Sequence, residues 1–346
     1  RPADCYRQAL HVFPGNDDAT QRLAKLGLSS QTGKDVDGAA KASSDGVEFY
    51  FVHADKLREA TAQDVGRLQA IHKDWIVKEK IDFRSAYSGK YKEQYCTVSH
   101  RWETRDKPDV GGVQFKAVQG YLLENPQIKY VWYDFWCMPQ GSDRSEEEVT
   151  EFKAMLQEVN VLYLGTEVLI LMDLSYMSRF WTSFEAYLSM QDPTADGLRP
   201  AEAAKCRAKI RCLHNAPPSF ATTLKDMWQG RSPQEAADIL EKPDVLVTNQ
   251  GDKDIQIQKL VTLNDKVSET VRSAEKETAA QVQKALEEAQ KAMKEFEEAG
   301  ARAQAAAKRA AAAGATQEQL QRAFEQPLSQ IHDATGQGRS STCTVQ

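Results

Sequence analysis

The 346-residue chain lacks any uninterrupted apolar stretch that approaches the roughly 20 residues needed to cross a bilayer as a helix. It also lacks an excess of basic residues, because its net charge is −6 and no cluster of Lys and Arg is interleaved with aromatic residues. Affinity for a phosphate backbone comes from such clusters. These absences predict that the protein is neither an integral membrane protein nor a nucleic-acid binder.

Cysteine is sparse, and its spacing does not fit a metal site. Cys206, Cys212 and His214 lie near one another in the sequence, but they lack the Cys-x-x-Cys or paired-His pattern of a metal-binding set. Cys96 and Cys137 fall in apolar segments, which favours reduced thiols in a cytoplasmic protein over a disulfide framework. We therefore expect no metal. A Gly-rich phosphate loop is also lacking, and chain order supports no Ser-His-Asp arrangement.

Composition divides the chain into four regions. Residues 1–46 contain Gly and Ser-Asp runs typical of a flexible arm, with one short helix near residues 19–28. Residues 47–250 hold all six tryptophans and are expected to form a globular α/β domain. Residues 255–313 have almost no Gly and are dominated by Ala, Glu, Lys and Gln, which predicts one long helix. Residues 314–346 form a looser, polar tail.

The central region alternates between strand and helix patterns. Apolar runs predict three strands, and helical stripes with start and stop signals predict a helix after each. The strands are expected at residues 95–99, 128–135 and 167–173, and the helices at residues 113–125, from about Glu146 after a capping box at Ser145, and at residues 179–190. Short links between these elements predict an open parallel sheet with flanking helices and right-handed crossovers.

Further elements are predicted on either side of this pattern. Residues 49–52 predict a strand, and a helix is expected through Leu68, Ile71 and Trp75; neither can be placed against the sheet. A capped helix is expected to start near Ser232, and residues 245–247 are a candidate extra strand.

Polar and aromatic side chains follow the ends of the three strands. Ligands of open parallel sheets bind at the carboxyl ends of strands, where loops and helix N-termini converge, so we expect these side chains to share one site. A structural role stays open for each of them, such as capping by Asp134 or Asp173, but their convergence favours a common site. The residues are Ser99, His100, Arg101, Trp102, Asp134, Trp136, Asp173, Ser178 and Glu185.

Three motifs in this order resemble a known family. Residues 98–102, 130–140 and 179–185 are similar to the first-strand, second-strand and Trp-Thr-x-x-Glu blocks of fungal heterokaryon-incompatibility (HET) domains. HET domains are relatives of the Toll/interleukin receptor (TIR) fold, whose third helix carries a similar Trp-x-x-x-Glu. The resemblance covers about residues 95–190 and implies a flavodoxin-like or TIR-like open parallel sheet.

The chain departs from the family pattern at three places. Glu103 stands where HET domains usually have Gly, and Met138-Pro139 interrupts the usual Cys-Ile-x-Gln. Thr182 stands where TIR domains commonly have Cys. The match is therefore closer to the HET side, where enzymatic activity is a less secure inference than it is for TIR enzymes.

The resemblance implies cleavage of the nicotinamide–ribose bond of NAD in a signalling role in defence, cell death or stress, with Glu185 as the catalytic carboxylate. One carboxylate can suffice, because the nicotinamide ring of NAD is cationic and becomes a neutral molecule when it leaves, so it needs no proton. The expected NAD-binding residues are Trp102, Trp136 or Trp181 for stacking, Arg101 for phosphate, Ser99 or Asp134 for ribose, and His100, Asp173 and Ser178 nearby.

Two other functions stay open. The domain is either a non-catalytic assembly module or a nucleotide sensor that binds NAD without turnover. A structural account also exists for the motif itself, in which Trp181 is a core residue and Glu185 pairs with an arginine such as Arg179.

The predicted long helix carries a heptad-like seam of apolar residues at steps of three or four. The seam predicts a coiled coil and hence a homo-oligomer or a helix-mediated partner. Many seam positions are alanine and bury little area, so docking of the helix on the domain at its Leu260 end is an equal alternative. The seam consists of Leu260, Val267, Val271, Ala274, Val282, Ala285, Ala289, Phe296, Ala299 and Ala303.

The last four residues, from Cys343 to Gln346, match a C-a-a-X box whose glutamine end favours farnesylation, provided that the chain ends naturally here. No polybasic run precedes it, so one lipid would give reversible membrane contact of a cytoplasmic protein.

Overall fold

The computed structural model describes residues 46–247, 250–316 and 318–319. The expected N-terminal arm up to residue 45, with its short helix, and the C-a-a-X sequence at Cys343 lie outside the described residues. The chain divides into two units, residues 1–274 and 275–346, which are described separately.

A six-stranded sheet forms the centre of the first unit, in the order β2-β1-β4-β3-β5-β8. Its strands are β1 (Gly46–His53), β2 (Ile76–Asp82), β3 (Tyr95–His100), β4 (Tyr130–Trp132), β5 (Glu167–Met172) and β8 (Ala208–Cys212). The four strands β4, β3, β5 and β8 are parallel, as predicted for the central region. β1 is antiparallel to both β4 and β2, so the sheet is mostly parallel rather than wholly parallel.

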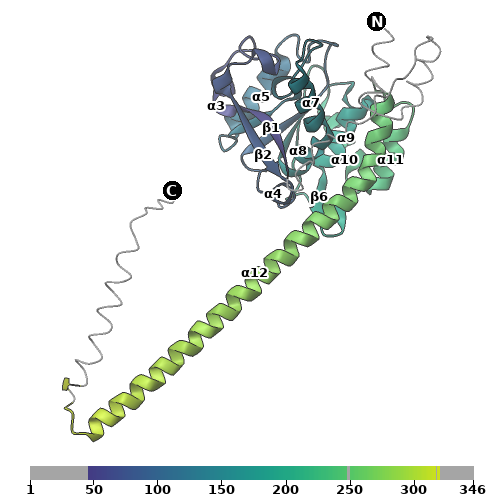
Figure 1. Ribbon diagram of the computed structural model, residues 1–346. Helices are drawn as coiled ribbons and strands as arrows, with labels where there is room; N and C mark the ends of the chain where they lie inside the picture. Colours follow the sequence, from purple (N-terminus) through teal and green to yellow (C-terminus); the bar gives the residue numbers. More distant parts are fainter. Residues whose placement is uncertain (1–45, 248–249, 317, 320–346) are drawn as a thin grey trace. The chain divides into compact units, whose positions relative to one another are not determined.

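The helices flank this sheet, and α3 packs against α5 while α8 packs against α9 (Figure 1). The predicted helix starts at Glu146 and after Ser232 are confirmed, each with a complete capping box. The helices are α3 (Ala54–Glu59), α4 (Phe83–Tyr87), α5 (Val113–Glu124), α6 (Asp134–Cys137), α7 (Glu146–Glu158), α8 (Asn160–Gly165), α9 (Phe180–Ser189), α10 (Pro218–Trp228), α11 (Pro233–Glu241) and α12 (Gln250–Ala312).

Two predicted elements are wrong. The helix through Leu68, Ile71 and Trp75 is replaced by two short 3-10 turns, η1 (Leu68–Ala70) and η2 (Lys73–Trp75). Ile71 lies between them in an extended conformation and is buried, so the core anchors the chain at the point where a helix would have continued. Residues 245–247 form no strand; a single parallel bridge joins Leu246 to Arg179.

The pleat of β3 sends alternate side chains to opposite faces of the sheet. Thr97 and Ser99 face the side of α8 and α9, where Thr97 Oγ1 lies 2.7 Å from Thr166 Oγ1. Cys96 lies on the other face with its register partner Glu167, which accepts a hydrogen bond from Tyr121 of α5. The α8–α9 side therefore receives the side chain of Ser99, the last inward residue before the strand ends.

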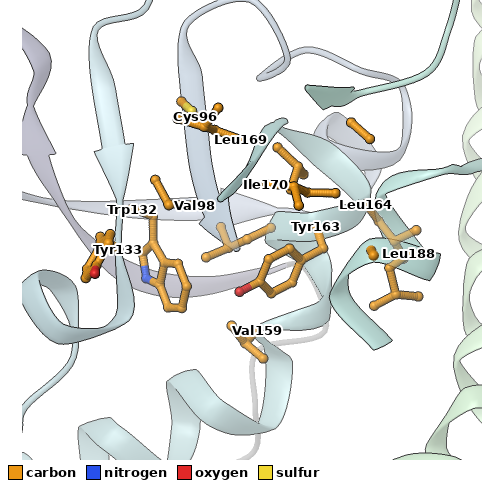
Figure 2. Packing of buried hydrophobic residues seen from close by; sticks show 14 of the residues in the cluster. Cys96, Val98, Trp132, Tyr133, Val159, Tyr163, Leu164, Leu169, Ile170 and Leu188 are labelled. Carbon is orange, nitrogen blue, oxygen red and sulfur yellow. The ribbon is translucent and has the colours of Figure 1, made fainter. Parts of the chain in front are cut away.

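The core on the α8–α9 side is aromatic. The rings of Trp132 and Tyr163 meet edge to face, with centroids 6.2 Å apart (Figure 2). α8 can approach α4 closely because it ends at Gly165, where a Cβ atom would lie 2.6 Å from Cβ of Ala86. This close approach helps to set the position of Tyr163 two residues earlier.

A small hairpin of β6 (Gln191–Thr194) and β7 (Gly197–Pro200) precedes β8, and the first part of α12 contacts it. Leu260 and Val267 of α12 are fully buried, and Lys266 forms a 2.8 Å ion pair with Glu158. The docked Leu260 end is therefore present, within a single long helix as predicted. No helix in the described part of the chain combines the length and apolar character needed to span a membrane.

Candidate functional site

A cavity of about 360 Å³ opens at the carboxyl ends of β3, β4 and β5. The charged side chains of its lining, together with two tryptophans and a histidine, form two groups. The β3–β4 wall consists of His100, Arg101, Trp102 and Asp134, and the β5–α9 wall consists of Arg179, Trp181 and Glu185. The parallel strands place both walls at one edge of the sheet, which is where the sequence predicts a ligand site.

The polar groups of the β3–β4 wall are largely satisfied by one another. Asp134 accepts hydrogen bonds from Nε2 of His100 at 2.9 Å, from Nε1 of Trp102 at 2.7 Å and from the backbone N–H of Phe135 at 2.6 Å. Arg101 donates through Nε to Asp173 at 2.6 Å and through Nη1 to the carbonyl of Trp102 at 2.7 Å. The tautomer of His100 that donates from Nε2 to Asp134 fits this arrangement, and its buried Nδ1 has no partner in the described residues.

The carboxyl group of Glu185, on the opposite wall, contacts hydroxyl groups. Ser99 donates to Glu185 Oε2 at 2.6 Å, and Tyr163 forms a second side-chain hydrogen bond with Glu185. The Ser99 hydroxyl lies 2.5 Å from that of Tyr176, which is fully buried. Among the residues that the structure describes, no Lys or Arg forms an ion pair with Glu185.

These surroundings disfavour the charged form of Glu185. Burial raises the pKa of the Glu185 carboxyl to about 8 and outweighs the hydrogen bonds from Ser99 and Tyr163, which lower it; nearby Asp134 raises the pKa further. Burial also raises the pKa of Tyr163 and of Tyr176 well above the ordinary value, so both remain neutral hydroxyls. At neutral pH these surroundings therefore keep Glu185 mainly in its protonated form.

Arg179 is the other charged group of the β5–α9 wall. Arg179 lines the cavity, and its side chain has no hydrogen bond or ion pair to any described residue. Arg101, by contrast, is already occupied by Asp173. Arg179 is thus the better candidate for an anionic ligand group such as phosphate.

A short strap, residues 246–247, closes one side of the cavity. The backbone of Leu246 donates to the carbonyl of Ser178 at 2.7 Å and accepts from Phe180 at 2.8 Å. Lys253, near the start of α12, donates to the carbonyls of Lys242 and Val245 at 2.7 and 3.0 Å. The strap is therefore held by both α9 and α12.

The structure brings most of the predicted residues to the cavity. Ser99 donates a hydrogen bond to Glu185 but does not line the cavity. The predicted residues that line it are Glu185, His100, Arg101, Trp102, Asp134 and Trp181. Three others do not line it. Trp136 is buried and stacked on Tyr133 at 4.1 Å, Asp173 holds Arg101, and the hydroxyl of Ser178 donates to the carbonyl of Ser175.

The sequence analysis missed two residues that contact or support Glu185. Tyr176 lies three residues after Asp173 in a strand-end loop, so the rule that selected Asp173 extends naturally to it. Tyr163 belongs to α8, which follows α7 with no distinctive motif, and the sequence carries no signal for its contact with Glu185. The alternative in which Glu185 pairs with Arg179 does not hold in the structure.

Within the described residues, no group of three or more His, Cys, Asp or Glu side chains is arranged to hold a metal ion. No model of a known protein family, no curated protein and no solved structure matches this chain.

Proposed function

We propose that the protein is a HET/TIR-like signalling protein in defence, cell death or stress response that hydrolyses the nicotinamide–ribose bond of NAD. The observation that carries this proposal is the position of Glu185, a partly buried carboxyl that faces a cleft and contacts hydroxyl groups rather than cations. A carboxyl paired with arginine would be neutralised before a substrate arrived. Glu185 has no such partner among the described residues and can therefore stabilise positive charge in the substrate.

The reaction requires one such group. The C–N bond breaks with its electron pair going to the ring nitrogen, so nicotinamide leaves as a neutral molecule and the ribose carbon gains positive charge. Ionised Glu185 stabilises that charge, and water then adds to the carbon and gives up one proton. General-acid help for the leaving group is unnecessary, which explains how one glutamate can do the work that paired carboxylates do in ordinary glycosidases.

The rest of the cleft suits the remaining parts of NAD. Trp102 and Trp181 are partly exposed and line the cavity, where an indole face can stack on nicotinamide or adenine. The unpaired guanidinium of Arg179 fits the pyrophosphate. The resemblance to HET and TIR domains supports the same assignment through the motifs at residues 98–102 and 179–185, and the mostly parallel sheet agrees with it.

An NAD-consumption assay tests the proposal. Wild-type protein at high concentration should release nicotinamide, and Glu185→Ala should lower the rate by at least ~100-fold, the typical effect of removing one group that stabilises transition-state charge. Glu59→Ala, at an exposed position on α3, is the matched control and should retain the wild-type rate. Intact NAD after incubation with clustered wild-type protein, or wild-type turnover by Glu185→Ala, would refute the proposal.

Assembly through the second unit is a second candidate function. Val282, Leu286, Met293 and Phe296 are 63%, 51%, 64% and 80% exposed. Their spacings of four, seven and three residues place them on one face of α12. Four large apolar side chains on one exposed helix face favour a helical partner.

A second copy of the chain is the partner that fits this face. In an antiparallel pair centred on Ala289, Val282 would face Phe296 of the other copy. Met293 would face Ala285 and Leu286 would face Ala292, so each of these large residues meets a small one. Light scattering over a range of concentrations should show a dimer for the wild type and a monomer for Met293→Glu/Phe296→Glu. Lys294→Glu, on another face of α12, should remain dimeric, and a strictly monomeric wild type would exclude this mode of assembly.

A further inference from the structure

The Glu185 carboxyl group is surrounded by hydroxyl groups and one carboxylate, with no cation paired to it in the described residues. The groups that interact with it come from four elements: Ser99 from β3, Tyr163 from α8, Tyr176 from η3 (Tyr176–Ser178) and Asp134 from α6. His100, Arg101 and Arg179 are the other titratable or charged groups that line the cavity. His100 is bound to Asp134 and Arg101 to Asp173, so neither neutralises Glu185.

The hydroxyl groups around Glu185 can serve both of its protonation states. When Glu185 is ionised, Ser99 and Tyr163 donate to it and Tyr176 donates to Ser99. When Glu185 is protonated, its O–H donates to Ser99, whose hydroxyl turns toward Tyr176 at 2.5 Å. Only hydroxyl hydrogens rotate between the two states, because Ser and Tyr oxygens both donate and accept. The protein can therefore exchange this proton without moving a heavy atom.

We propose that Glu185 releases its proton when a positively charged ring binds beside it and keeps the proton when the ring is neutral, so that the cleft selects N-substituted pyridinium ligands by coupled proton release. The inference rests on the proposed function and specifies its substrate class. Ionised Glu185 beside a pyridinium ring is an ion pair in a partly buried site, whereas a neutral ring leaves the carboxylate uncompensated. Asp134, which lines the same cavity, adds to the cost of an uncompensated negative charge.

The proton balance of the reaction closes on this scheme. Binding of NAD releases the Glu185 proton to solvent. Nicotinamide then leaves with the electron pair of the C–N bond, and water adds to the ribose carbon. The proton given up by that water returns Glu185 to its neutral form. One cycle thus converts NAD and water into ADP-ribose and nicotinamide with net release of one proton, and it regenerates the resting enzyme.

A pair of ligands that differ in ring charge tests the coupling without turnover. 1-Methylnicotinamide carries the cationic ring and has no ribose bond to cleave, while nicotinamide is neutral. Calorimetry at pH 7 in two buffers of different ionisation enthalpy counts the protons released. With the pKa of Glu185 at about 8, binding of the cation should release about 0.9 proton, and nicotinamide should release none. Affinity for the cation should rise nearly tenfold between pH 6 and pH 7 and level off above pH 8.

Three variants separate this coupling from a general change in structure. Glu185→Gln should bind the cation without proton release and without pH dependence. Tyr163→Phe removes a hydrogen bond that favours the ionised form and should shift the affinity curve to higher pH. Tyr187→Phe is the matched control, because Tyr187 lies on α9 and its buried hydroxyl has no partner in the described residues; its curve should match the wild type.

The outcomes distinguish the inference from the proposed function. Turnover that depends on Glu185, combined with cation binding that releases no proton, would overturn the inference alone. Cation-linked proton release by a protein that leaves NAD intact would support the inference and refute hydrolysis. Failure of the folded wild type to bind 1-methylnicotinamide, or equal proton release by Glu185→Gln, would also overturn the inference.

Discussion

The two walls of the cleft contain the same kinds of residue, but their charged groups are paired in one wall and unpaired in the other. Each has a carboxyl, an arginine and a tryptophan. On the β3–β4 wall, Asp134 accepts three hydrogen bonds from N–H groups and Arg101 is paired with Asp173. On the β5–α9 wall, Glu185 contacts hydroxyls, and Arg179 has no side-chain partner among the described residues.

The difference separates scaffold from reactive surface within one cavity. Two charges that already form an ion pair compensate each other, so neither attracts a charged ligand strongly. A partly buried carboxyl without a cation and an arginine without an anion can still attract a ligand of opposite charge. Leaving them unpaired lowers the stability of the folded protein. The contrast therefore predicts that phosphate binding and chemistry depend on the charged groups of the β5–α9 wall, while the charged groups of the β3–β4 wall shape the cleft.

Exchanging each acid for its amide gives the largest expected difference between the walls. Glu185→Gln should lower kcat/KM by about 10²–10³, because it removes charge that the transition state needs. Asp134→Asn loses one acceptor for Trp102 or His100, and its effect on kcat/KM should be about tenfold, the value of roughly one hydrogen bond. Steady-state assays of both variants measure the ratio. Equal losses would show that the two carboxyls share the chemistry and would remove the distinction between the walls.

The arginines provide the next test. Arg179→Gln should raise KM for NAD by about 10–100-fold with little change in folding stability, since a charge-assisted hydrogen bond contributes about 1.5–3 kcal/mol. Arg101→Gln leaves Asp173 without its partner and should lower the free energy of unfolding by about 1–3 kcal/mol. Kinetics and urea denaturation on the same preparations separate these effects. The reverse pattern, with KM controlled by Arg101, would identify the β3–β4 wall as the phosphate site.

The sequence predicts the two walls unequally, for a physical reason. Asp134 and His100 lie at the ends of apolar strand patterns, and the strand-end rule places such residues without knowledge of side-chain packing. Glu185 was found through its helix motif, but its environment depends on Tyr163, which approaches it because α8 packs against α9. Local patterns carry no information about such a contact. Whether Arg179 is free or paired likewise depends on three-dimensional distances.

The sheet shows the same limit. Periodicity predicts β3, β4 and β5 and their parallel order, because short links through helices force right-handed crossovers. The apolar pattern of residues 49–52 predicts a strand but does not indicate its direction. β1 pairs antiparallel with β4, and only the register of Val52 with Val131 reveals it. The sequence marks residues 245–247 as a candidate strand but does not identify their partner, because the single bridge from Leu246 to Arg179 joins segments that are far apart in the chain.

The smallest expected effect concerns stability, and it separates the walls without any substrate. Glu185 has a pKa of about 8 in the folded protein against 4.5 as its ordinary value. Between these values the unfolded chain has lost the proton and the folded protein has kept it, so the free energy of unfolding falls as pH rises. The decrease has an upper limit set by the pKa difference, and water in the cleft screens part of it, so we expect about 1–3 kcal/mol between pH 5 and pH 8.

Glu185→Gln cannot titrate and should lack this decrease, so its stability relative to the wild type should increase from pH 5 to pH 8. Glu59→Gln, at an exposed position, should follow the wild-type profile. Urea denaturation at several pH values measures the difference. If Glu185→Gln and the wild type show parallel profiles, the carboxyl is already ionised in the empty cleft. The β5–α9 wall would then be as well satisfied as the β3–β4 wall, and the reason for assigning the chemistry to Glu185 would disappear. A variant whose stability relative to the wild type increases with pH, and whose activity is lost, would instead show that the folded protein maintains an unfavourable carboxyl where a cationic ligand can compensate it.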